Sequence, residues 1–98
     1  MKNAQVVRNW LHSWSFNMLS LEAEEGIRVA DLVRQCFHFL GRIDKDGAEH
    51  EMYNMWWLHV SRTILKILHE CQQQGIDCNY RVGISIMHHI QGGEEEFV

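Results

Sequence analysis

Apolar residues recur with a helical period in three long stretches of the chain. In residues 6–21 they fall within an arc of about 140° on a helical wheel, and in residues 27–40 they again share one face. A third stretch, from about Ala48 to Gln74, keeps the same period and would be roughly 40 Å long as a helix. The pattern therefore predicts three helices, of which the third is the long central element.

Polar residues and glycines between these stretches predict where the helices begin and end. Asn3 is suited to cap the start of the first helix, and Gly41 is suited to close the second. Asp46, followed three residues later by Glu49, has the spacing of a capping box for the third helix. Gly75 is expected to end that helix, because glycine readily adopts the left-handed conformation that follows a helix.

The segment 78–87 is compatible with two different structures. Its apolar and polar residues alternate, which is the period of a strand. The same region also forms one polar helical stripe, with Asp77 as N-cap and Gly92 as the stop. A single strand in a helical chain has nothing to pair with except the same strand of a second copy, so helix is preferred. The predicted fold is all-α, a compact bundle of three to four helices, with a strand pairing in a dimer as the alternative for this segment.

The composition is that of a small globular protein with a single helical domain over residues 1–98. Of the 98 residues, 46% are hydrophobic and 22% are charged, which is typical of a chain that folds. The chain has no proline, so its helices can continue without interruption. Residues 93–98, which include three consecutive glutamates, are expected to form a short acidic tail.

Charge and the lengths of the apolar runs restrict the partners and the compartment. The formal net charge of −4 argues against a dedicated nucleic-acid binder, because phosphate contacts require a basic surface. No run of about 18 apolar residues is present that would span a bilayer. The first ten residues lack the apolar core of a signal peptide, so we expect a cytoplasmic protein. The three cysteines have no paired spacing, which fits reduced thiols in that compartment.

No residue pattern in the chain is typical of catalysis, so we expect neither an enzyme nor a bound cofactor. Cys36 and His38, the closest nucleophile and base in the sequence, would point to different sides of one helix. Zinc binding is an alternative, because one set of histidines and cysteines lies around the end of the third helix and in the last segment. Its two cysteines are separated by six residues, whereas structural zinc sites usually separate the first ligand pair by about two to four. The set comprises His69, Cys71, Cys78, His88 and His89.

Two adjacent tryptophans, Trp56 and Trp57, lie near the start of the third helix. With Met52 at zero on a helical wheel, they lie at about 40° and 140°. Both positions fall within the apolar arc of this helix, which extends from roughly 0° to 160°. The pattern therefore predicts that both indoles lie on one broad buried face.

Three apolar residues of the third helix lie outside that arc. Leu58 and Leu65 are one heptad apart at about 220° to 240°, and Met55 lies at about 300°. Such a pair is suited to contact another helix, whether the fourth helix, a second copy or a partner. A weakly basic stripe runs beside it and consists of His59, Arg62, Lys66 and His69. A similar off-face pair, Phe16 and Leu19, occurs in the first helix. The candidate partner-binding residues are Met55, Leu58, Leu65, His59, Arg62, Lys66 and His69.

These observations favour a non-enzymatic protein-interaction module, a small cytoplasmic helical regulator or inhibitor that binds a larger protein and forms a homodimer. By analogy of size and composition, one specific form is an inhibitor of the kind that phages direct against host nucleases or defence systems. The first alternative is a nucleic-acid or nucleotide-binding accessory factor that uses the basic stripe with Arg8, Arg28 or Arg34. The second is a small domain stabilised by zinc.

Overall fold

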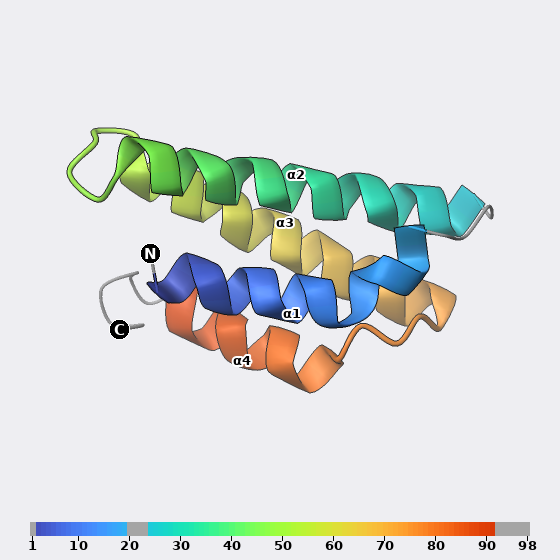
Figure 1. The fold of residues 1–98 in the computed structure, drawn as a ribbon. Coiled ribbons are helices and arrows are strands. Elements are labelled where there is room, and N and C mark those ends of the chain that lie inside the picture. The colour runs from blue at the N-terminus through green and yellow to red at the C-terminus, as the bar shows by residue number, and fades with distance from the viewer. Residues whose placement is uncertain (1, 20–23, 92–98) are drawn as a thin grey trace.

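The computed structural model describes the backbone of residues 2–19 and 24–91 and the side chains of residues 3–15 and 28–90. The described residues form four helices and no strand. The helices are α1 (Lys2–Leu19), α2 (Glu24–Asp46), α3 (Tyr53–Gln74) and α4 (Tyr80–Gln91), shown in Figure 1. The all-α prediction is confirmed. The strand alternative for residues 78–87 is wrong, because α4 occupies this region.

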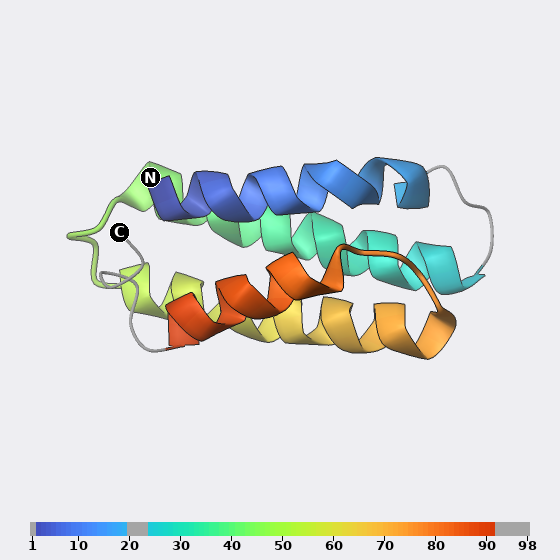
Figure 2. The same cartoon turned by 90° about the horizontal axis from the view of Figure 1, so that it is seen from below.

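Successive helices run in opposite directions and pack around one core. In both views, α2 lies beside α1 and α3, while α4 lies beside α3 and also contacts α1 (Figures 1 and 2). Burying one aliphatic side chain of this kind stabilises the fold by about 1.5–3 kcal/mol. Every helix contributes apolar side chains to the core, among them Val7, Leu11, Val33, Leu40, Val60, Ile64, Ile86 and Ile90.

The second helix continues past Gly41, so the prediction that this glycine ends it is wrong. Ile43 is completely buried and extends the apolar face by one more turn, which keeps the chain helical to Asp46. The residue that closes the helix is Gly47, whose φ of 83° is left-handed and whose N–H donates to the carbonyl of Ile43 at 3.0 Å. The sequence around Gly41, which is exposed inside α2, therefore looks like that of a capping glycine, although Gly47 is the residue that caps the helix.

The third helix begins at Tyr53, not near Ala48. Its N-cap is Met52, which makes no side-chain capping hydrogen bond, so the predicted capping box of Asp46 and Glu49 is wrong. The physical reason is that Asp46 is the last residue of α2. At the other end the prediction is confirmed, because Gly75 has a φ of 68° and caps α3.

Two further capping predictions are also wrong. Asn3 lies inside α1, which begins at Lys2, and its side chain is buried instead of capping the helix from outside. Asp77 precedes the first residue of α4 by three positions, and its carboxylate accepts a hydrogen bond from the backbone N–H of Asn79 at 3.2 Å. This local turn satisfies Asp77 before the helix starts. The carbonyl of Asn79 then accepts from the N–H of Gly83 at 3.2 Å in the first turn of α4.

Trp10 connects α1 to the segment between α3 and α4. Its indole N–H is shared between the carbonyl oxygens of Cys78 at 2.9 Å and Asn79 at 3.1 Å. The same indole lies against Gly83 of α4. A Cβ added at Gly83 would lie 2.7 Å from Cζ2 of Trp10 and 2.6 Å from Cδ2 of Leu68, distances at which atoms overlap. These contacts fix the side of α3 on which α4 packs.

Candidate partner-binding surface

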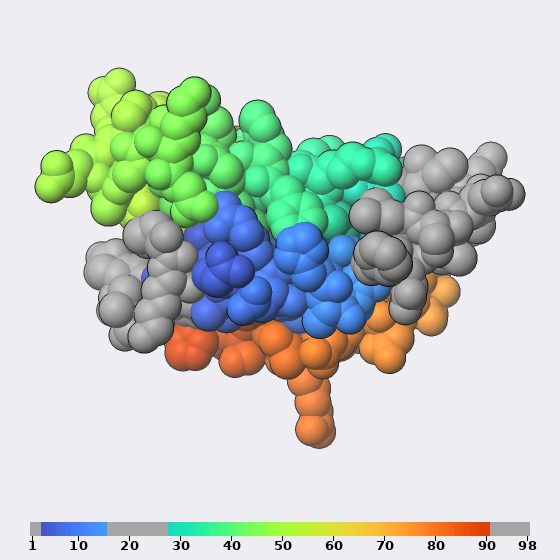
Figure 3. Space-filling view, in the orientation of Figure 1, coloured from blue at the N-terminus to red at the C-terminus, as the bar shows by residue number. Residues whose placement is uncertain are grey.

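The described residues leave the outer side of α3 uncovered. Because α4 packs next to Leu68, it leaves Leu58 and Leu65 with 42% and 46% of their surface exposed. Met55, on the same side, is 43% exposed. Of the three coverings that the sequence left open for the leucines, the fourth helix is therefore excluded. On the opposite side of the bundle, by contrast, α1 fills the space between α2 and α4 (Figure 3).

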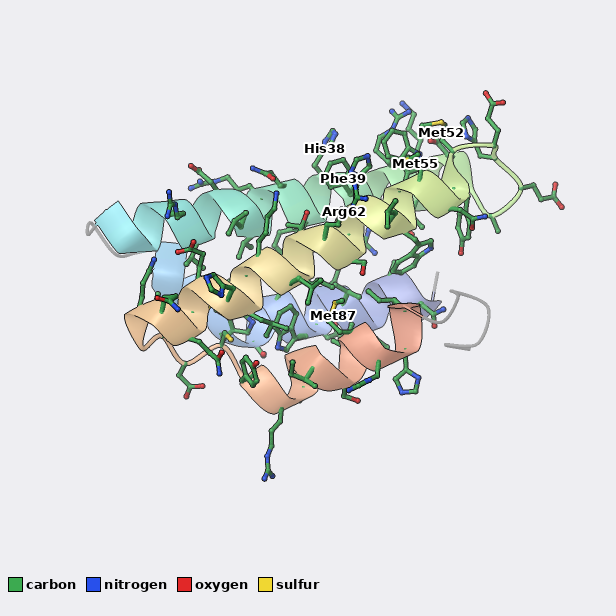
Figure 4. All side chains as sticks on the ribbon, turned by 180° about the vertical axis from the view of Figure 1, so that it is seen from behind. His38, Phe39, Met52, Met55, Arg62 and Met87 are labelled. Atoms are coloured by element: carbon green, nitrogen blue, oxygen red, sulfur yellow. The ribbon has the colours of Figure 1, made fainter. Side chains whose placement is uncertain are left out.

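We define the α2–α3 face as this outer side of α3 together with the adjoining side chains of α2. Figure 4 shows His38 and Phe39 of α2 near Met55 and Arg62 of α3 on this side. All seven predicted partner-binding residues belong to α3 and contribute to it. The face comprises Met55, Leu58, His59, Arg62, Leu65, Lys66 and His69 of α3, and Leu32, His38 and Phe39 of α2.

An aromatic cluster lies at the end of this face near the turn between α2 and α3. The ring of Phe39 stacks on His59, with centroids 4.7 Å apart, and on Trp56 at 6.1 Å. The guanidinium of Arg42 lies 5.4 Å from the centre of the Trp56 ring. The carboxylate of Asp46 accepts the indole N–H of Trp56 at 2.8 Å, which holds the ring in place. The cluster gives this end of the face a rigid surface.

The two adjacent tryptophans differ in exposure. Trp57 is almost completely buried, as the sequence predicts, whereas Trp56 is only partly buried at the edge of the core. The sequence interpretation missed the aromatic cluster because it assigned Phe39 to the buried face and Asp46 to a cap. One signal was available, since Phe37 and Phe39 are two positions apart and cannot both lie at the centre of one helical face.

A shallow apolar groove lies at the other end of the face, between α2 and α3. Its volume is about 350 Å³, at the small end of the range for ligand pockets. The guanidinium of Arg28 and the carboxylate of Glu70 form an ion pair of 3.4 Å across it. The groove includes three of the predicted residues and is lined by Arg28, Leu32, Leu65, Lys66, His69 and Glu70.

The cations of this region differ in whether they have a carboxylate partner. Arg28, Arg34 and Arg42 are paired with acidic side chains of the bundle. Arg62 and Lys66, both exposed, have no carboxylate within ion-pair distance among the described residues. The α2–α3 face therefore carries two uncompensated positive charges beside exposed apolar side chains, on a chain whose net charge is −4.

The residues of the zinc hypothesis do not meet at one point. Among the residues that the structure describes, no group of three or more histidine, cysteine or acidic side chains could hold a metal ion. Cys71 and Cys78 do meet, as a buried hydrogen-bonded pair of free thiols. Burial raises the pKa of both thiols. His69, His88 and His89, the other members of the set, are exposed.

The nucleophile and base that are closest in the sequence are also apart in the structure. Cys36 is completely buried in the core while His38 is exposed, so the two do not form a nucleophile and base pair. Burial raises the pKa of the Cys36 thiol to about 12, which keeps it protonated and unreactive near neutral pH. The second off-face pair, Phe16 and Leu19, and the acidic tail 93–98 lie outside the described side chains.

Comparisons with known proteins supply no relative from which a function could be transferred. No protein-family model, no curated protein and no solved structure matches the chain. Within the part of the chain that the structure describes, no helix has the length and apolarity needed to cross a membrane.

Proposed function

We propose that the protein is a non-enzymatic protein-interaction module that binds a larger protein through the α2–α3 face. The observation that carries this proposal is the exposure of Leu58 and Leu65, one heptad apart, on a bundle whose fourth helix packs elsewhere. Large apolar side chains that lie together in water are unfavourable for a free monomer, and such patches commonly mark interaction sites. The specific form of a phage-type inhibitor rests on size and composition alone and stays a prediction.

The order of the aromatic end of the face supports the same proposal. Its side chains are presented by two long, tightly packed helices, and Phe39, His59 and Trp56 already hold one another in place. A surface that is ordered before binding loses little conformational entropy when a partner docks. Leu65 lies beside the ammonium-bearing Lys66 and the polar side chains of His69 and Glu70, which also fits the apolar centre and polar rim of a protein interface.

The experiment compares capture by matched variants in cells of the source organism. The test variant is Leu58→Glu with Leu65→Glu. The control is Val6→Glu with Val82→Glu, because these valines are 39% and 40% exposed but lie on α1 and α4. We expect the native protein and the control to retain the same co-purifying protein, and the test variant to lose it. If all three retain an identical set of proteins, the α2–α3 face does not bind the partner.

Nucleic-acid binding has weaker support from the arrangement of charges. Arg8, Arg28 and Arg34, which this alternative would use, each form an ion pair with a carboxylate of the bundle. Only Arg62 and Lys66 of the proposed stripe remain as unpaired strong cations, whereas duplex binders typically neutralise about 6–10 phosphates. A salt titration with oligonucleotides tests the alternative, because binding that falls steeply with salt would favour it over a protein partner.

A further inference from the structure

We infer that the segment that occupies the α2–α3 face is an acidic amphipathic helix of another protein, with two apolar residues one heptad apart and carboxylates beside them. This inference rests on the proposed function and specifies the chemistry of the partner. It follows from the spacing of the exposed leucines, the unpaired cations next to them and the charge that a second copy would bring.

The spacing of the apolar side chains fits a helix laid along α3. Leu58 and Leu65 are separated by two helical turns, roughly 10.5 Å along the axis. A helix that runs beside α3 presents side chains at the same interval when they are seven residues apart. The groove between Leu32 and Leu65 extends this contact toward α2 at one end. At the other end, Met55 is exposed and can adapt its flexible side chain to the partner.

The cations next to the leucines define the charge of the partner. Arg62 and Lys66 are four residues apart on α3, so they lie one above the other on the same side of the helix. Their exposed heads have no carboxylate among the described residues to neutralise them. A neutral or basic partner helix would desolvate these two charges without compensation, which is costly. A helix with glutamates or aspartates at a matching interval of four would neutralise both.

The same charges argue against a second copy of the chain on this face. If two copies of α3 paired antiparallel through Leu58 and Leu65, the two-fold axis would pass between Ser61 and Arg62. Each Arg62 would then approach the Arg62 of the other copy, and like charges in a closed interface are destabilising. The homodimer expected from the sequence would therefore have to use a different surface.

The inference is tested with a displayed library of random 20-residue peptides selected for binding to the folded protein. We expect the enriched peptides to carry a net negative charge, with large apolar residues at positions i and i+7 and acidic residues beside them. Binding should weaken at least tenfold for Arg62→Glu with Lys66→Glu. Peptides whose acidic residues are replaced by lysine should bind that variant and not the native protein. The Val6→Glu with Val82→Glu control should bind the enriched peptides like the native protein.

Each other outcome rejects a defined part of the argument. The inference of an acidic helix is overturned if neutral or basic peptides are enriched, or if no peptide is enriched. It is also overturned if Arg62→Glu with Lys66→Glu leaves the affinity unchanged. If the enriched peptides are not acidic but still lose binding to Leu58→Glu with Leu65→Glu, the proposed function is retained and only the acidic helix is rejected. A native dimer in solution that Leu58→Glu converts to a monomer would assign the face to a second copy. Oligonucleotide binding that depends on Arg62 would assign it to nucleic acid.

Discussion

Replacement of Gly83 by alanine tests the close approach of α1, α3 and α4 that determines where the exposed surface lies. The new Cβ would lie 2.6 Å from Cδ2 of Leu68 and 2.7 Å from Cζ2 of Trp10. The leucine can change its rotamer, but the indole cannot retreat freely. Its N–H is held by the carbonyls of Cys78 and Asn79, at 2.9 and 3.1 Å. The substitution must therefore displace a side chain that two hydrogen bonds position.

The expected change in the free energy of unfolding is the sum of two destabilising contributions and one stabilising contribution. Overpacking of a well-filled core costs about 1–3 kcal/mol. Weakening the hydrogen bonds of Trp10 costs about 0.5–1.5 kcal/mol more. Alanine returns about 1 kcal/mol through its higher helix propensity. We expect Gly83→Ala to lower the free energy of unfolding by about 0.5–3.5 kcal/mol.

Gly41 is the matched control because it also lies inside a helix, yet a Cβ there meets nothing within 4 Å. Gly41→Ala gains the same helix propensity without overlap and should raise the free energy of unfolding by about 0.5–1 kcal/mol. Urea unfolding followed by circular dichroism measures both variants. If Gly83→Ala is stabilised as much as Gly41→Ala, the three helices do not approach one another as described.

Three further outcomes test other parts of the structure. Trp10→Phe should lower the free energy of unfolding by about 1–3 kcal/mol through its lost hydrogen bonds. The indole N–H of Trp14 has no acceptor among the described residues, so Trp14→Phe should lower the free energy of unfolding less than Trp10→Phe does, as measured by calorimetry. Stability should fall as pH rises from about 9 to about 12, since Cys36 ionises near 9 when unfolded but near 12 when folded. Between these two pH values a thiol of this kind lowers the folding equilibrium constant about tenfold per pH unit. Cys36→Ala should therefore make stability depend less steeply on pH in alkaline denaturation. Leu58→Glu and Leu65→Glu should each change the free energy of unfolding by less than about 0.5 kcal/mol, and a larger loss would contradict their exposure.

Periodicity predicted the helices and most of the core because a helix with one buried face repeats its apolar residues every three to four positions. Val33, Leu40 and Ile64 follow this rule, and all are buried. The ends of the helices were harder to predict. Gly41 and Asp46 carry ordinary signals for the end of one helix and the start of the next. The burial of Ile43 carries α2 past Gly41, and that burial depends on contacts with other helices.

For the candidate surface, too, the sequence predicts which face a residue lies on but not which other helix covers it. The sequence identified Leu58 and Leu65 as residues off the main apolar face, but not whether the fourth helix covers them. The position of α4 depends on its fit at Gly83 against Trp10 and Leu68, a contact between distant parts of the chain. The ring of Phe39 against His59 likewise joins α2 to α3 across the turn between them. A local pattern can show that a residue leaves the buried face, but not which distant residue it then contacts.

The hydrogen bond from Trp10 to Cys78 also affects the order of events during synthesis, because its two residues are 68 positions apart. A ribosome that adds about 5–20 residues per second makes the acceptor about 3–14 s after the donor. During this interval α1 can form, and α2 and α3 can pack, while the indole still lacks its native partner. The indole N–H of Trp10 therefore remains without its two native acceptors until residues 78 and 79 have been synthesised and α4 can pack against α1.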